Sequence, residues 1–320
     1  MTALLASRPA ILLIGPTASG KTALACALAD RFPVDIVSVD SAMVYRGMDI
    51  GTAKPDVAMQ ARYPHALIDL VSPEESYSAA RFCADARDAA ERSWANGRVP
   101  LLTGGTMLYV RALLEGLSAM PAAQPELREQ IENEARLRGW SALHAELARV
   151  DAQTAARIKP NDSQRIGRAL EVYRISGVPM SQWHTHPKPA VSLFGSLLQV
   201  GLMPSDRAAL HERIALRFDA MLADGLVEEV RGLRARHALT ADLPSMRCVG
   251  YRQVWEFLES GGNAHELRDK GIAATRQLAK RQMTWMRAMG ALELVDPLSA
   301  RHADDVIARA AKLMGAALGH

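Results

Sequence analysis

A glycine-rich stretch near the N-terminus has the residue types and spacing of a phosphate-binding loop, because it fits G-x-x-x-x-G-K-[ST] at every fixed position. It consists of Gly15, Pro16, Thr17, Ala18, Ser19, Gly20, Lys21 and Thr22. An apolar run at 10–14 precedes it and an alanine-rich run at 23–29 follows it, which predicts a strand, a turn and a helix that together bind an anion. Lys21 adds a positive charge and the Thr22 hydroxyl can ligate Mg²⁺. The stretch therefore predicts a site for linked phosphates, whichever molecule carries them.

Two carboxylates are associated with predicted strands close to this loop. The run 34–39 reads as a strand that ends at Asp40 and Ser41, and the run 66–70 reads as a strand that contains Asp69. Sheets of alternating strands and helices bind ligands at the carboxyl ends of their strands. Each aspartate is a candidate Mg²⁺ ligand, general base or simple turn residue, and chain position does not separate these roles.

Basic residues gather in three places. The predicted helix around 272–287 carries Arg276, Lys280, Arg281 and Arg287 and no acid, and Arg276, Lys280 and Arg287 fall on one face. Such a stripe suits the phosphates of a nucleic acid, although a charged helix face is more often only solvated. Two smaller clusters lie at 164–168 and 247–252, each with a glycine that permits close approach of a backbone.

Composition is that of a globular protein with ample core. The chain has 320 residues, of which 49% are hydrophobic and 23% charged, and its formal charge of +3 does not by itself demand a nucleic acid. The three cysteines, Cys26, Cys83 and Cys248, are too far apart in sequence for a metal motif or a disulfide framework, which favours a reducing cytoplasm. We find no signal-peptide pattern and no apolar run long enough to span a membrane.

Strands and helices alternate over the first third of the chain, which predicts an α/β fold: a doubly wound parallel sheet of the P-loop NTPase type. Further strands are expected at 99–103, 197–202 and 292–295, and helices at 78–96 and 107–114. From 121 to 189 no strand pattern occurs and helices are expected at 125–138, 141–149 and 163–176. We therefore predict a core made of 1–120 and 190–320, its second part mostly helical, and an all-helical insertion at 121–189.

Several motifs occur together in a fixed order along most of the chain. They lie at 15–22, 40–41, 45–55, 104–109, 161–168, 250–251 and 275–282. With this ordered set the chain closely resembles the tRNA dimethylallyltransferase family, also called isopentenyl-pyrophosphate transferases, in its bacterial type. One departure is Met43, where many members carry glutamine, so an amide contact to a base is not expected there.

The resemblance implies transfer of a dimethylallyl group from its pyrophosphate, with Mg²⁺, to N6 of the adenosine immediately 3′ of the anticodon in certain tRNAs. It implies catalytic roles for Asp40 as the base, Thr106 as a second base contact, Arg217 near the reacting groups, and Lys21 on the diphosphate. The phosphate loop would then hold a leaving group. The implied tRNA contacts are Asp40, Ser41, Ala42, Met43, Thr106, Arg128, Gln164, Arg165, Ile166, Gly167, Arg168, Arg247, Cys248, Val249, Gly250, Tyr251 and Arg252, to which the basic stripe adds Arg276 and Lys280.

The helical insertion would bind the anticodon stem-loop, and the partners expected are tRNA and dimethylallyl pyrophosphate, with the protein acting as a monomer. Two other functions share a phosphate loop. A small-molecule or nucleoside kinase would transfer phosphate from ATP, and a nucleic-acid-binding ATPase would hydrolyse ATP in response to RNA.

Overall fold

The computed structural model describes residues 8–185 and 193–318. They form two compact units, one made of 8–114 with 193–318 and one within Glu115–Val191. The first unit is built on a six-stranded, all-parallel sheet with strand order β3-β2-β4-β1-β5-β6. Its strands are β1 (Pro9–Ile14), β2 (Val34–Val39), β3 (His65–Ala66), β4 (Val99–Gly104), β5 (Ser196–Leu202) and β6 (Glu293–Val295). The predicted α/β class with a parallel sheet is confirmed.

The central strands end level with one another. Ile14 of β1 pairs with Gly104 of β4, and Gly104 pairs with Val39 of β2. β1 and β4 are buried along their whole length, as expected for strands covered on both faces. The segments that follow these three strands therefore emerge side by side at one edge of the sheet.

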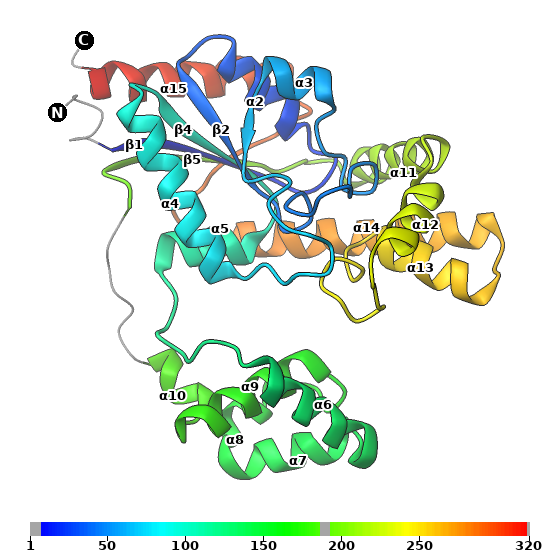
Figure 1. Cartoon of the computed structure of the whole chain (residues 1–320). Coiled ribbons are helices and arrows are strands. Elements are labelled where there is room, and N and C mark those ends of the chain that lie inside the picture. Colours follow the sequence, from blue (N-terminus) through cyan, green and yellow to red (C-terminus); the bar gives the residue numbers. More distant parts are fainter. Residues whose placement is uncertain (1–7, 186–192, 319–320) are drawn as a thin grey trace. The chain divides into compact units, whose positions relative to one another are not determined.

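Helices cover both faces of the sheet (Figure 1). On one face lie α2 (Lys21–Ala29) and α15 (His302–Leu318), and α4 (Ala79–Ala95) covers the other. Beyond the carboxyl ends of the strands, α11 (Arg207–Ala223) packs against α14 (Ala264–Arg287), with α12 (Leu226–Arg236) and α13 (Tyr251–Ser260) alongside. The remaining helices of this unit are α3 (Val57–Arg62) and α5 (Met107–Glu115).

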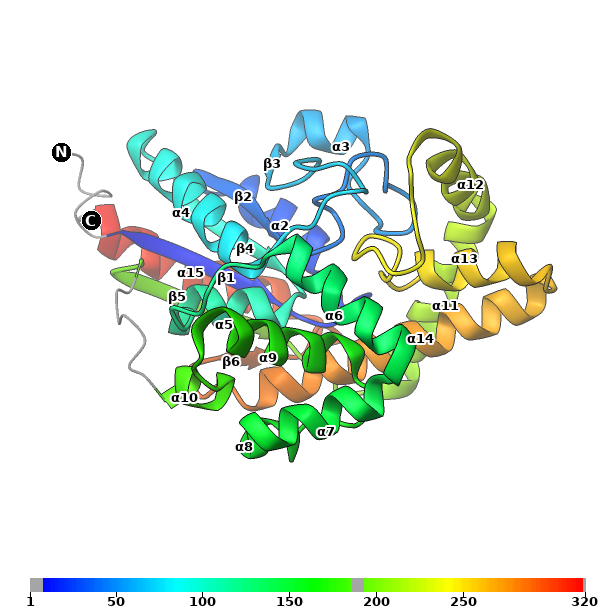
Figure 2. The same ribbon diagram turned by 60° about the horizontal axis from the view of Figure 1, so that its bottom comes forward.

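The second unit is helical throughout its described residues. It contains α6 (Pro125–Arg138), α7 (Trp140–Val150), α8 (Ala152–Ala155), α9 (Ser163–Ser176) and α10 (Met180–Thr185). Figure 2 shows α6, α7 and α9 side by side, where they enclose a core of Ile131, Leu143, Leu147, Ile166 and Leu170. The unit spans Glu115–Val191, a few residues beyond the 121–189 expected from the sequence, and the end of that interval, 186–189, lies outside the described residues.

The strand expected at 66–70 is shorter than predicted. It ends at Ala66 because Leu67 and Asp69 adopt positive φ angles of 65° and 54°, which a strand does not accommodate. The chain instead turns onto the loop after β2, where the Asp69 amide donates to the Met43 carbonyl at 3.1 Å. The short helices α8 and α10 were not predicted.

Gly104 offers a test of how closely β2 and β4 must approach. A Cβ at this position would lie 2.1 Å from the carbonyl oxygen of Val39, so Gly104→Ala forces the two strand ends apart. We expect a loss of about 1–3 kcal/mol in the free energy of unfolding, the usual cost of overpacking, measured by urea denaturation. Gly290→Ala is the control, because a Cβ there would meet no atom within 4 Å, and an equal effect of the two changes would refute the steric account.

Candidate active site

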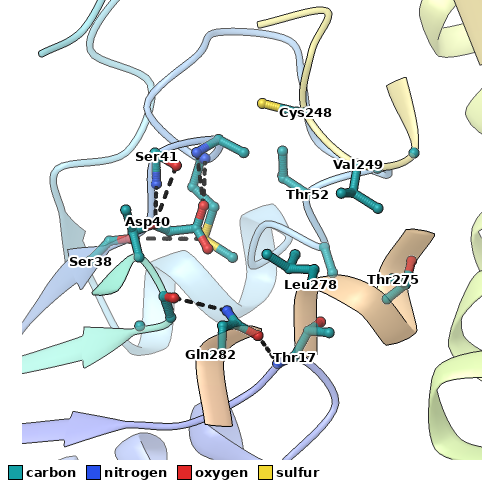
Figure 3. Close-up of a pocket in the computed structure, with 18 of the residues that line it drawn as sticks. Thr17, Ser38, Asp40, Ser41, Thr52, Cys248, Val249, Thr275, Leu278 and Gln282 are labelled. Carbon is teal, nitrogen blue, oxygen red and sulfur yellow. Dashed lines mark hydrogen bonds between the residues drawn. The ribbon is translucent and has the colours of Figure 1, made fainter. Parts of the chain in front are cut away.

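A cavity of about 550 Å³ opens at the carboxyl edge of the sheet (Figure 3). Its wall combines the phosphate loop, the segments after β2 and β4, the loop before α13, and one face each of α11 and α14. Several predicted residues meet here. These are Thr17, Lys21, Thr22, Asp40, Ser41, Ala42, Met43, Thr106, Arg217, Arg247, Cys248, Val249 and Gly250.

The glycine-rich stretch folds as a tight turn between β1 and α2. Gly20 caps α2 with a φ of 89°, and Lys21 at the start of the helix folds back so that its Nζ donates to the Pro16 carbonyl at 2.7 Å. Burial, and then the charge of the neighbouring Arg217, lower the pKa of Lys21 to about 7, against the opposing effect of Asp40. A lysine whose ammonium group is buried in this way is stabilised by any anion that enters the loop.

Arg217 reaches the same place from α11. Its Nε is buried without a hydrogen-bond partner among the described residues, and burial lowers the pKa of its guanidinium. The hydroxyl of Ser19 is likewise buried and unpartnered. A hollow of about 320 Å³ beside the large cavity is lined by Ala18, Ser19, Gly20, Lys21, Thr22, Arg213 and Arg217. Two buried cations and orphaned donors around one hollow define a site for a multiply charged anion.

Asp40 is held by the turn that follows β2. Its Oδ1 accepts from the amides of Ala42 at 2.8 Å and Met43 at 3.3 Å, whereas its Oδ2 has no hydrogen bond within the described chain. Thr106, in the turn after β4, accepts from the Ser41 amide at 2.9 Å and lies 3.2 Å from the Ser41 hydroxyl. The carboxylate is thereby fixed in the cavity wall with one oxygen available to a ligand.

Gln282 of α14 is a structural member of the site that the sequence did not single out. Its Nε2 donates to the Gly105 carbonyl at 2.8 Å and its Oε1 accepts from the Thr17 amide at 3.0 Å, as Figure 3 shows. A Cβ at Gly105 would approach Nε2 to 2.4 Å, so the contact needs glycine there. The sequence signal was an amide one helical turn after Leu278, at the end of the motif at 275–282 and in a segment otherwise noted for its charge.

The other predicted tRNA contacts of this unit lie outside the cavity wall. Arg276 and Lys280 are exposed on α14 and form no ion pair with any described residue, and Arg252 is exposed and pairs with Glu256 at 2.9 Å. Tyr251 differs from these exposed residues. Its side chain is fully buried and donates to Glu229 at 2.5 Å, so its ring packs in the core and does not face a ligand.

In the helical unit the predicted contacts fall into two groups. Gln164 and Arg165 are exposed, and Arg165 pairs with Asp162, while the side chain of Ile166 lies in the core of the unit. Gly167, the next residue, is half-buried.

Arg128 and Arg168 both bind the fully buried Glu171, at 3.0 and 2.6 Å, and Arg168 also donates to the Pro121 carbonyl. These hydrogen bonds hold the pKa of Glu171 low against the opposing effect of its burial. The two arginines therefore have a structural role in this unit, because without either of them the buried Glu171 carboxylate would lack a hydrogen-bond donor.

Metal and membrane features are sparse in the described part of the chain. It contains no cluster of three His, Cys, Asp or Glu side chains able to hold a metal ion, and Asp69 pairs with Lys54 at 2.6 Å outside the cavity wall. Of the candidate metal ligands, Thr22 and Asp40 lie in the wall of the cavity, and the Oδ2 of Asp40 has no hydrogen bond among the described residues. Among the described helices, none has the length and hydrophobicity to cross a bilayer.

A phosphate loop, two buried cations and a carboxylate at the switch between parallel strands define a phosphate-loop enzyme of the α/β class. Comparison with known proteins identifies the family of phosphate-loop enzymes to which the chain belongs. A family model described as IPP transferase matches residues 43–289. The chain is 57% identical over 311 residues to a tRNA dimethylallyltransferase of Thiobacillus denitrificans, covering 97% of both chains, and 61% identical over 279 residues to that of an Azoarcus species, covering 87% of both.

Solved structures agree. A tRNA isopentenylpyrophosphate transferase of Bacillus halodurans is 32% identical, with a TM-score of 0.67 and 97% of both chains covered. A eukaryotic dimethylallyltransferase shares the fold with a TM-score of 0.80 at 23% identity, covering 96% of this chain and 80% of that one. The chain belongs to the IPP transferase family. The predicted resemblance is confirmed, and the protein is a prenyltransferase and not a kinase.

The low pKa of Lys21 predicts how diphosphate binding responds to pH. A bound diphosphate favours the ammonium form, so above pH 7 binding must take up a proton on Lys21. The apparent dissociation constant for inorganic pyrophosphate should therefore rise from pH 7 toward pH 9.5, by up to about tenfold per pH unit from this group. Calorimetry across that range measures it.

Lys21→Arg is the matched control, because arginine stays charged throughout this range. The ionisation of pyrophosphate itself affects both proteins equally, so the difference between the two curves isolates Lys21. Parallel curves for wild type and Lys21→Arg would contradict the assignment.

Proposed function

We propose that this protein transfers a dimethylallyl group from dimethylallyl pyrophosphate to N6 of the adenosine 3′-adjacent to the anticodon of tRNA, giving N6-isopentenyladenosine and pyrophosphate. The observation that carries the proposal is the pair of buried cations, Lys21 and Arg217, that share one hollow without an ion-pair partner among the described residues. Next to them, Asp40 keeps a free carboxylate oxygen in the same cavity. One end of the site suits a diphosphate, and the adjacent part suits an amine that attacks the carbon attached to the diphosphate and gives up a proton.

Each residue of the site has a place in the transfer. The bond between C1 of the dimethylallyl group and its bridging oxygen breaks, and the electron pair leaves with pyrophosphate, whose growing charge Lys21, Arg217 and the loop amides stabilise. The N6 lone pair forms the new bond to C1. Because this lone pair is conjugated with the ring, the amine needs a base, and Oδ2 of Asp40 accepts its proton.

Mg²⁺ fits the loop as a hard cation that takes oxygen ligands, with the Thr22 hydroxyl as the protein ligand and phosphate oxygens and water as the others. It would supply further neutralisation of the leaving pyrophosphate. Thr106 would orient the adenine beside Asp40, since its hydroxyl is itself oriented by Ser41.

The tRNA would bind over the open side of the cavity. Moving the target base out of the anticodon-loop stack costs a few kcal/mol, which contacts elsewhere must offset. We assign these to the cavity rim at 40–43, 106 and 247–250, to Arg252 and the exposed stripe of Arg276 and Lys280, and to the helical unit as the binder of the anticodon stem-loop through Arg128 and 164–168. We further propose that the protein acts as a monomer in the cytoplasm, where its tRNA substrate is made.

The direct test is mass spectrometry of tRNA nucleosides after incubation with dimethylallyl pyrophosphate and Mg²⁺. The proposal requires N6-isopentenyladenosine at the position after the anticodon. Lys21→Ala should greatly reduce it, because the loop loses its one lysine. Phosphate transfer from ATP with no prenylated adenosine would overturn the proposal.

Asp40→Asn tests the base. The asparagine keeps the size and one acceptor but loses the charge and most of the basicity, so the single-turnover rate of transfer should fall by about 10² to 10⁴-fold. Affinity for dimethylallyl pyrophosphate with Mg²⁺ should change little, because that site lies on Lys21, Thr22 and Arg217. Recovery of near wild-type rate at high Mg²⁺ would show that Asp40 serves the metal and not the amine.

The basic stripe is tested by salt dependence. Arg276→Ala and Lys280→Ala should each weaken tRNA binding and lower the slope of log affinity against log salt by roughly 0.7 to 0.9, the value of one lost phosphate contact. Arg31→Ala is the control, because it removes the same charge from an exposed site after α2. Arg168→Ala is a poorer probe of backbone contact, since it also uncovers Glu171. Unchanged slopes for both stripe variants would mean that the stripe does not contact the tRNA backbone.

A further inference from the structure

Helix α11 presents a series of side chains along the site. Arg213 lines only the small hollow of the phosphate loop, Arg217 lines the hollow and the large cavity, and Met221 lines only the large cavity. These residues are four apart, so each step is about one helical turn, or roughly 6 Å. Ile214 and Phe218, on the same face, also line the large cavity. One helix therefore offers cations to the phosphate loop and, next to those cations, apolar side chains to the large cavity.

Phe218 closes the apolar part of this series. Its side chain is only 2% exposed, and its ring is seated on the backbone of α14 at Gly271. A Cβ at Gly271 would lie 1.9 Å from the tip of the ring, so glycine is what lets the ring lie there. Gly271 does not itself line the cavity. The ring thus fills the space between the cavity and this point of α14.

The other apolar side chains of the wall are less suited to set a limit. Met221 is unbranched and half-buried, and such side chains yield to a ligand by changing rotamer. Leu278 and Thr275 project from α14 toward the cavity in Figure 3, which places them along its side. The Phe218 ring is rigid and is backed by main chain, so it cannot retreat without moving α14.

We propose that Phe218, seated on Gly271, limits the hydrocarbon of the donor to a single isoprene unit. This inference rests on the proposed function and adds which residue sets the chain length. Phe218 directly follows Arg217 on α11 and lines the large cavity, so the hydrocarbon of a diphosphate bound at Arg217 and Lys21 would lie against this ring. Geranyl diphosphate carries a second isoprene unit, and that unit needs about the volume that the ring occupies.

Phe218→Ala and the milder Phe218→Leu test this limit with dimethylallyl and geranyl diphosphates as competing donors to tRNA. Removing the ring should raise the ratio of kcat/KM for geranyl over dimethylallyl diphosphate by roughly tenfold or more, the range expected when a hydrophobic pocket gains room for added carbons. Mass spectrometry distinguishes the two prenylated adenosines. Thr275→Ser, which trims another wall residue but not the end of the cavity, is the control and should leave the ratio unchanged.

Gly271→Ala supplies the opposite change. Its methyl group must displace the Phe218 ring, so this variant should use dimethylallyl diphosphate less well and gain nothing with geranyl diphosphate. Combined with Phe218→Ala, the methyl group refills part of the vacated space, and the gain on geranyl diphosphate should shrink. Such a reversal depends on the contact between the two residues, and general loosening of the fold would not produce it.

Failure of the inference is separable from failure of the proposed function. If wild type transfers the dimethylallyl group and Phe218→Leu, folded and active, keeps the wild-type donor ratio, the chain-length limit lies elsewhere and the inference is overturned. If wild type transfers no dimethylallyl group, the proposed function itself is wrong and the inference falls with it. Thermal unfolding of each variant establishes that the folded protein is compared.

Discussion

The site depends on three parallel strands that end level with one another. The register that pairs Ile14 with Gly104 and Gly104 with Val39 brings the phosphate loop, the Asp40 turn and the Thr106 turn to one edge of the sheet. Side chains cannot be accommodated where these ends converge, since a Cβ at Gly104 would collide with the Val39 carbonyl. The close approach of main chains sets the distances within the site before any functional side chain is placed. The rigidity of the site comes from the buried sheet beneath the site.

The two cations of the site then favour the binding of a negatively charged ligand. Lys21 and Arg217 are buried near one another, and the pKa of each is lowered, so the protein bears an unfavourable charge arrangement in the absence of an anion. Any anion that binds between them relieves that cost and is therefore bound more tightly. Natural proteins retain such local instability where function requires it, because the rest of the fold supplies the stability. Here the fully buried neighbouring strands β1 and β4 provide that support.

The sequence predicted the parts of this design that are local along the chain. The phosphate loop, the strand leading to Asp40, most helix bounds and the fold class follow from motif, periodicity and turn residues. Contacts between distant segments do not. Gln282 lies 265 residues from the Thr17 amide that it binds, and a charged helix gives little sign that one amide turns inward. The sequence shows the charge of Arg168 but not that the buried Glu171 binds it, because a pattern of residue types does not record which charges pair. The early end of β3 likewise reflects main-chain conformation at Leu67, which residue type alone does not dictate.

Tyr251, the first residue of α13, lies outside the cavity wall but helps to fix the shape of the cavity. Burial, and then the nearby Glu229, raise the pKa of Tyr251, so it remains a protonated donor to that carboxylate. The same carboxylate accepts from the amides of Asp49, Ile50 and Gly51, which ties the loop over one side of the cavity to α12 and α13. Gly51 and Gly250 both line the cavity, so one carboxylate spans two of its walls. A cavity braced in this way can hold its shape around a small donor, and the exposed, unpaired cations of α14 remain free to meet a larger partner. The same chain thus separates a preformed pocket for the donor from an adaptable charged surface for the nucleic acid.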